Sequence, residues 1–181
     1  MKSFLKTPFE HMLQGLAYWL TYKRETYKCQ VIEADIVMEA VQILQAYLPH
    51  CFKLVREYPY RNISQGLGRK YADLAILNNN GDCECFMEFK FADSTNGSYT
   101  KDITKMSGVK AFQGNIDCYS IIVFRKSTPL NEPKNLVLHD GKARRVVFYE
   151  GSQKYKVKRV CNAVSSHTAT TMKKVICLEL L

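Results

Sequence analysis

Two acidic residues and a lysine lie in neighbouring apolar runs. Asp73 is in YADLAIL, and Glu88 and Lys90 are in CECFMEFKF, which follows it. Carboxylates bind Mg²⁺, and bound Mg²⁺ can act as a Lewis acid toward phosphate and activate water. A lysine beside such a site can orient or deprotonate the water, or offset charge in the transition state. These residue types could therefore hydrolyse a phosphodiester. The spacing D-x₁₄-E-x-K alone occurs by chance in many proteins, and a solvated strand face could carry the same residues.

The turn between the two runs predicts how these residues lie relative to one another. Asn80-Gly81 is a strong signal for a β-hairpin, and a two-residue type I′ turn there places Asp73 directly opposite Glu88. Because strand side chains alternate, both acids and Lys90 share one face, and the other face packs in the core. Opposed carboxylates about 5 Å apart repel, so they need a compensating cation. A one-residue slip of the register would separate them.

Helices and further strands should surround this hairpin. Thr7-Pro8 and Glu10 form a typical helix start, and Pro49 should stop a second helix. Helices are predicted over residues 7–25, 31–48 and 98–112, and strands over 52–58, 71–77, 83–91 and 117–125. Near the C-terminus, strands are predicted over 145–150, 155–161 and 175–180.

In this order, the elements and the acidic residues resemble the PD-(D/E)xK nuclease superfamily over about residues 31–125. The resemblance implies an α/β fold with a restriction-endonuclease-like core of helix, three-stranded hairpin unit, helix and strand. An N-terminal helix and extra C-terminal strands would complete a single domain of residues 1–181. Asp73 matches the family's aspartate and Glu88-Phe89-Lys90 its E-x-K, whereas Ala72 replaces the family's proline. By this resemblance Asp73, Glu88 and the Phe89 carbonyl bind Mg²⁺, for which Mn²⁺ can substitute, and Lys90 assists the attacking water.

Many members of that family add a glutamate from the helix before the first strand, and Glu33 and Glu39 are the candidates here. Glu33 projects near the centre of the apolar arc of its helix and Glu39 at the edge, so Glu33 is the better candidate for the site. A first-turn glutamate is also favoured by the helix dipole alone. Glu57 resembles a first-strand glutamate of some families, but it could instead pair with Arg56 or Arg61.

The net charge of +9, from 26 Lys and Arg against 17 Asp and Glu, favours nucleic acid, most simply DNA, as a partner. Arg61, Arg69 and Lys70 precede Asp73 on a loop that could contact phosphates. A second basic stretch spans positions 140–174 and contains Lys142, Arg144, Arg145, Lys154, Lys156, Lys158, Arg159, Lys173 and Lys174. Since one site cuts one strand, double-strand cleavage would need a homodimer or two successive nicks.

The remaining features limit the class of protein. No stretch approaches the roughly 18 uninterrupted apolar residues of a membrane span, and the seven cysteines lie mostly in apolar segments, which is typical of a cytoplasmic protein with reduced thiols. Asp102 and Lys105 match a pattern of some nuclease families, but a helix-surface ion pair explains them more simply.

The sequence therefore predicts a Mg²⁺-dependent DNA endonuclease. The alternative is a catalytically silent nucleic-acid-binding or assembly subunit that keeps a nuclease-like fold. An unrelated α/β enzyme acting on small phosphorylated molecules is a third hypothesis, which no glycine-rich phosphate loop supports.

Overall fold

The computed structural model describes residues 2–23, 27, 29–63, 66, 70–92, 98–124, 147–150, 153–165 and 168–181. Its helices are α1 (Ser3–Thr21), α2 (Glu33–Tyr47) and α3 (Ser98–Phe112), with a 3₁₀ turn η2 at Tyr60–Asn62. Its strands are β1 (Lys53–Pro59), β2 (Tyr71–Leu77), β3 (Cys83–Ala92), β4 (Asp117–Phe124), β5 (Val147–Glu150), β6 (Gln153–Ser165) and β7 (Thr168–Leu180). The predicted α/β class is confirmed.

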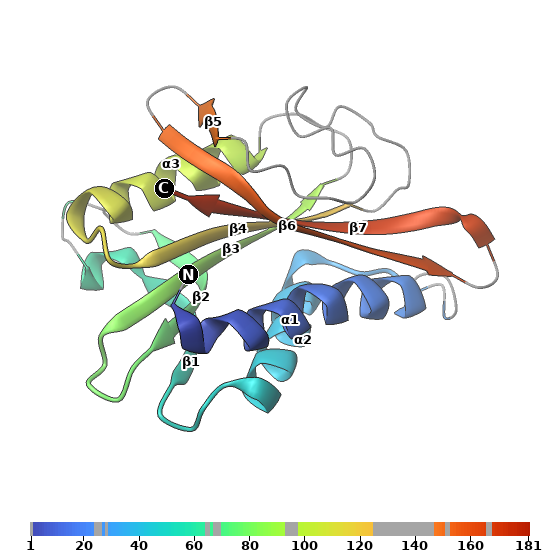
Figure 1. The fold of residues 1–181 in the computed structure, drawn as a ribbon, viewed down its shortest axis with the longest axis horizontal. Helices are drawn as coiled ribbons and strands as arrows, with labels where there is room; N and C mark the ends of the chain where they lie inside the picture. Colours follow the sequence, from blue (N-terminus) through green and yellow to red (C-terminus); the bar gives the residue numbers. More distant parts are fainter. Residues whose placement is uncertain are drawn as a thin grey trace.

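The seven strands form one sheet in the order β1-β2-β3-β4-β7-β6-β5. Neighbouring strands are antiparallel except β3 and β4, which run parallel and are connected through α3. Helices α1 and α2 lie on one side of the sheet and α3 on the other (Figure 1). Among the described residues, no helix combines the length and apolar character needed to cross a lipid bilayer.

Both faces of the central strands are buried. On the face covered by α1 and α2, the core includes Leu74, Met87 and Phe89. On the opposite face, Ala75 and Phe86 pack in a second core with apolar residues of α3. The expectation of a core on one face only was therefore wrong, because α3 covers the face that also carries Asp73 and Glu88.

Helix α1 begins earlier than its sequence signals predict. It starts at Ser3, so Pro8 lies inside the helix instead of at its first position, and it ends at Thr21 instead of near residue 25. A proline at this position removes one backbone hydrogen bond and costs about 3 kcal/mol. Contacts of the first turn offset that cost, because Leu5 is fully buried and the Phe4 ring stacks on Phe52 with centroids 4.1 Å apart.

The other elements of the first two thirds of the chain lie within two residues of their predicted limits. The C-terminal strand β5 also lies within two residues of its predicted limits, but β6 and β7 do not, since each contains 13 residues. They form a long hairpin that pairs from Tyr155↔Leu180 to Ser165↔Thr168. Polar residues dominate its far end, so the apolar alternation that predicts strands is missing there.

Candidate active site

The turn that positions the acids differs from the predicted two-residue type I′ turn. Asn78 N–H donates to the Asp82 carbonyl at 2.9 Å, Gly81 N–H donates to the Asn78 carbonyl at 3.0 Å, and Gly81 has φ +84°. This pattern is a loop of residues 79–81 in which a type I turn is followed by a glycine in the left-handed region. The Asn78 side chain stabilises the loop by accepting bonds from the Asn80 and Asp82 amides at 2.9 and 3.0 Å.

A bulge next to the turn restores the predicted register. Leu77 pairs with Cys83 and Ile76 with Cys85, so Glu84 is an extra residue on β3. From there the pairing is as predicted, with Leu74 opposite Met87. One further step along both strands places Asp73 opposite Glu88, as the simpler turn would have done.

The sheet opens at this point. Pairing between β1 and β2 continues to Pro59↔Tyr71, and pairing between β3 and β4 continues to Ala92↔Phe124. Pairing between β2 and β3, in contrast, ends at Leu74↔Met87. The two acidic residues therefore lie at the first positions where these strands are no longer joined by their backbones.

Carboxylates take the place of the missing backbone acceptors along the opening. Phe89 N–H donates to Asp73 Oδ2 at 2.7 Å, and Phe91 N–H donates to Glu33 Oε2 at 3.1 Å. Amides of alternate strand residues point the same way, so these are the two donors that β2 would otherwise have paired. The Phe89 carbonyl faces the same opening, because the N–H and C=O of a strand residue point to the same side.

Glu88 is the most enclosed member of the group, with 3% of its surface exposed. Its Oε1 accepts a hydrogen bond from the Tyr60 hydroxyl and lies 3.7 Å from Lys105 Nζ, and its carboxyl group is hydrogen-bonded to Asp73. Burial raises the pKa of Glu88 to about 8; the Tyr60 bond and Lys105 oppose the rise, whereas Asp73 and Asp102 add to it. Burial also raises the pKa of Asp73, against the Phe89 amide.

Two lysines accompany the acid pair. Lys90 Nζ lies 3.4 Å from Glu33 Oε2, and Lys105 Nζ lies 2.9 Å from Asp102 Oδ1. Burial disfavours the charge of Lys105, but its bond to Asp102 and the nearby acids raise its pKa overall. The structure thus brings the four predicted residues, Asp73, Glu88, Lys90 and Glu33, to one place.

Sequence reasoning missed Tyr60 entirely, and for Asp102 and Lys105 it preferred a helix-surface pair to the pattern of some nuclease families that they also match. Asp102 and Lys105 do form that pair, but Lys105 also approaches Glu88 on β3. The spacing of three between Asp102 and Lys105 could have placed both on one side of the helix. No sequence signal distinguishes Tyr60 from the other aromatic residues near Pro59.

Other candidates lie at the margin of the group or outside it. Glu39 lines a separate pocket with Trp19 and Lys23. Glu57 is exposed, has φ +49° and occupies the β1 position opposite Asp73. Its neighbours Arg56 and Tyr58 pair normally with β2.

The predicted phosphate-binding loop is described in part. Arg61 and Lys70 are exposed, and both adjoin Tyr60, whose N–H donates to the Lys70 carbonyl at 2.9 Å. Arg69 lies outside the described residues.

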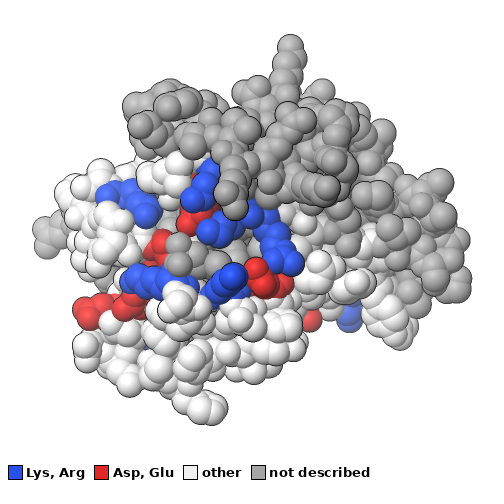
Figure 2. Space-filling view, viewed as in Figure 1, with Lys and Arg blue, Asp and Glu red and all other residues white. Residues whose placement is uncertain are grey.

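In the C-terminal basic stretch, the three basic side chains that the structure describes are all paired with acids. Lys156 and Lys158 each lie 3.0 Å from Glu179 Oε2, and Arg159 lies 2.8 Å from Glu10 Oε1. Figure 2 shows Lys and Arg side chains interspersed with Asp and Glu on the visible face. Lys142, Arg144 and Arg145 lie outside the described residues, and the side chains of Lys154, Lys173 and Lys174 are not described either.

The oxygen atoms around the Asp73–Glu88 pair determine whether a divalent cation fits there. Within the described ranges, no three His, Cys, Asp or Glu side chains are arranged as a ready metal-binding group. The Asp73–Glu88 pair nevertheless has the chemistry that a hard cation requires, namely two carboxyl groups in contact whose pKa values are both raised. The facing Phe89 carbonyl is a further oxygen of the preferred type. The residues present therefore fit Mg²⁺ or Mn²⁺, while Glu33 is held by Lys90 and the Phe91 amide.

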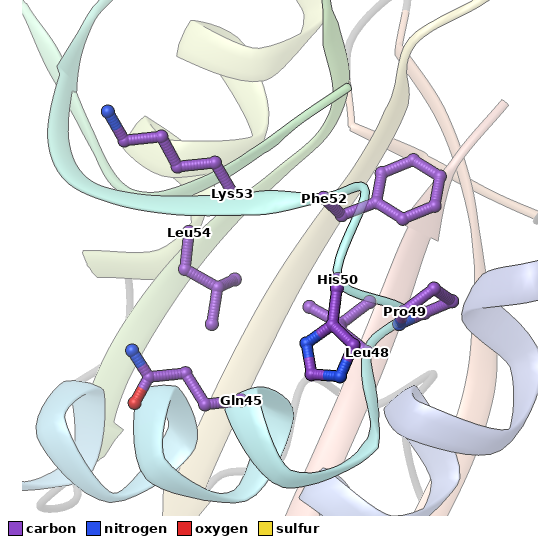
Figure 3. Close-up of a pocket in the computed structure, with 7 residues that line it drawn as sticks. All are labelled: Gln45, Leu48, Pro49, His50, Phe52, Lys53 and Leu54. Atoms are coloured by element: carbon purple, nitrogen blue, oxygen red, sulfur yellow. The ribbon is translucent and has the colours of Figure 1, made fainter. Parts of the chain in front are cut away.

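A pocket of about 510 Å³ lies elsewhere, at the junction of α2 and β1. Figure 3 shows Gln45, His50 and Leu54 around it, while the Lys53 side chain extends away. It adjoins the beginning of β1, whereas Tyr60 follows the end of that strand. None of the candidate site residues lines it.

Comparison with known proteins does not identify a relative. No family model matches the chain, and neither a curated protein nor a solved structure matches it.

Proposed function

We propose that this protein is a Mg²⁺-dependent endonuclease that hydrolyses DNA phosphodiester bonds through a PD-(D/E)xK-type site in a restriction-endonuclease-like core. One observation carries the proposal: the sheet opens between β2 and β3 at the point where Asp73 and Glu88 meet. Lys90 and Glu33 adjoin that opening. Two opposed carboxyl groups in an opening between strands, with a lysine two residues further on, suit metal-assisted hydrolysis better than they suit a structural role.

Asp73 and Glu88 would hold the cation, with the Phe89 carbonyl and Glu33 as the nearest additional oxygen donors. When bound, the cation supplies Lewis acidity toward a phosphate and makes water more acidic. Lys90 shares the strand face of Glu88, so its ammonium can orient a water molecule or offset negative charge. Glu33, 3.4 Å from Lys90 Nζ, keeps that ammonium beside the opening.

A polyanionic substrate agrees with the charge of the protein. The net charge is +9, and the exposed Arg61 and Lys70 adjoin Tyr60, which itself contacts Glu88. Phosphate contacts made by such residues position nucleic acid without reading its sequence. DNA is the proposed substrate. Cleavage rates of DNA and of RNA of the same sequence test this, and DNA should be cleaved faster.

The test is cleavage of DNA by Asp73→Asn and Glu88→Gln proteins in the presence of Mg²⁺. Both changes keep the shape of the side chain and remove the charge that holds a cation, so the cleavage rate should fall at least about 100-fold. Glu84→Gln is the matched control, because Glu84 is on the same strand but its carboxylate binds Lys2 and Asn78. Parental rates in folded Asp73→Asn and Glu88→Gln proteins would refute the proposal.

Two observations favour the binding-only alternative. Each of the three acids already accepts a hydrogen bond from the protein, and the described residues contain no ready three-ligand group. Calorimetric titration with Mn²⁺, with and without DNA, separates the two proposals. DNA binding without any metal binding that depends on Asp73 and Glu88 would favour a silent nucleic-acid-binding or assembly subunit.

A further inference from the structure

Lys105 lies between an acid of its own helix and an acid of the sheet. Its Nζ is 2.9 Å from Asp102 Oδ1 and 3.7 Å from Glu88 Oε1. An ordinary i,i+3 pair on a helix surface would account for the first contact but not for the second. The ammonium therefore belongs to the same group of charges as the Asp73–Glu88 pair.

The Lys105 side chain is more exposed to solvent than the two acids that it contacts. The Lys105 side chain is 28% exposed, whereas the side chains of Glu88 and Asp102 are 3% and 8% exposed. Solvent thus reaches the lysine but hardly reaches the two acids. An anion that approaches the acid pair from the α3 side meets this ammonium before it meets Glu88.

The two lysines of the site come from different elements. Lys90 is on β3 and is paired with Glu33 at the start of α2, while Lys105 is on α3 and is held by Asp102. A phosphate at the opening between β2 and β3 could therefore be contacted by cations from two directions. This arrangement suits a phosphodiester, whose non-bridging oxygens point away from each other.

We propose that Lys105 binds a phosphate of the nucleic acid, next to the bond that is cut, and that Asp102 is the residue that positions it. This proposal rests on the proposed function. The same ammonium opposes a cation at Glu88, so Lys105 weakens binding of the metal alone while it strengthens binding of the nucleic acid.

These two effects have opposite signs and can be measured separately. In Lys105→Met, Mn²⁺ measured by calorimetry without nucleic acid should bind as tightly as in the parent or up to about tenfold more tightly, because a nearby positive charge is removed. The affinity for a fluorescent DNA duplex, measured by anisotropy with Ca²⁺ present, should fall about tenfold. The slope of log affinity against log salt should fall by about 0.9, the value for one phosphate contact.

Three further variants make the result decisive. Lys105→Arg keeps the charge and should keep most of the salt slope. If Lys105→Met does not fold, Lys105→Gln also removes the charge and should show the same loss of slope and affinity, and parental values there would contradict the inference. Lys110→Met is the control on the same helix, because Lys110 Nζ is 3.3 Å from the Gly114 carbonyl and away from the acids. It should leave the salt slope unchanged.

The outcomes separate this proposal from the nuclease proposal. If Lys105→Met lowers stability but leaves the DNA affinity and its salt slope at parental values, Lys105 is only a structural partner of Asp102 and the inference is wrong. If Asp73→Asn and Glu88→Gln nevertheless abolish cleavage, the nuclease proposal stands even though the inference about Lys105 is wrong. If these two variants cleave DNA at the parental rate, the nuclease proposal is wrong, and the inference about Lys105 loses its basis.

Discussion

In the cation-free protein, the free energy of unfolding should fall as the pH rises from about 5 to about 8, because of Glu88. This carboxyl group is 3% exposed, and Asp73 and Asp102 lie near it, while Tyr60 and Lys105 stabilise its charge. Its pKa is about 8 in the folded protein against 4.5 ordinarily. Between those values the folded protein keeps a proton that the unfolded chain has released. Stability therefore decreases with pH in this window.

The magnitude follows from the size of the shift. Each unit of pKa difference corresponds to 1.36 kcal/mol, so the full shift of Glu88 has an upper limit of about 5 kcal/mol between acid and mildly alkaline pH. Relaxation around the buried group and the coupling to Asp73 reduce this upper limit. The free energy of unfolding is therefore expected to fall by about 2 kcal/mol or more between these pH values. That is a large part of the stability of an ordinary domain.

The assay is urea denaturation of the parent and of Glu88→Gln at several pH values, with a chelator present. Glutamine keeps the hydrogen-bonding shape of the neutral acid and cannot ionise, so the difference between the two proteins should grow as the pH rises. Glu84→Gln should keep the parental pH dependence between about pH 5 and 8, because Lys2 lowers the pKa of Glu84 and its own contribution changes only at more acid pH. A difference between parent and Glu88→Gln that does not vary with pH would refute the assignment of a buried, protonated Glu88.

Three further predictions follow from the same contacts. Tyr60→Phe removes the hydroxyl that stabilises the charged form of Glu88, so Mn²⁺ affinity measured by calorimetry should weaken about tenfold, and unchanged affinity would exclude this role. Binding of Mg²⁺ near pH 7 should release about one proton from the Asp73–Glu88 pair, visible as a dependence of the binding heat on the buffer, and no release would show that the pair is already ionised. Gly81→Ala, at φ +84°, should lower the free energy of unfolding by about 1 kcal/mol in urea denaturation while leaving metal affinity intact; a neutral effect would argue against the left-handed turn.

The hairpin shows how local sequence can predict a register through an incorrect turn. Asn80-Gly81 predicts a two-residue loop, but the chain forms a longer loop and then inserts Glu84 as a bulge. The two departures cancel, so Asp73 still comes opposite Glu88. Alternating apolar residues on both strands favour this outcome, because a one-residue slip would turn buried side chains toward the wrong face.

Contacts between distant segments were not predictable in the same way. Tyr60 reaches Glu88 because the strand divergence and the 3₁₀ turn bring it there, and neither feature leaves a periodic pattern in the sequence. Similarly, the basic residues Lys156 and Arg159 are paired with Glu179 and Glu10, which are far from them in the chain. Composition indicates how many charges are present, but only the fold determines which of them remain available for a partner.

The central claim is that the Asp73–Glu88 pair holds a divalent cation, and anomalous diffraction from crystals soaked in Mn²⁺ tests it most directly. An anomalous peak is expected about 2 Å from a carboxylate oxygen of each residue, with Glu88 still accepting the hydrogen bond of the Tyr60 hydroxyl. The peak should disappear in Glu88→Gln crystals grown and soaked in the same way. Carboxyl groups that keep the arrangement described above, with no peak between them at saturating Mn²⁺, would contradict the account.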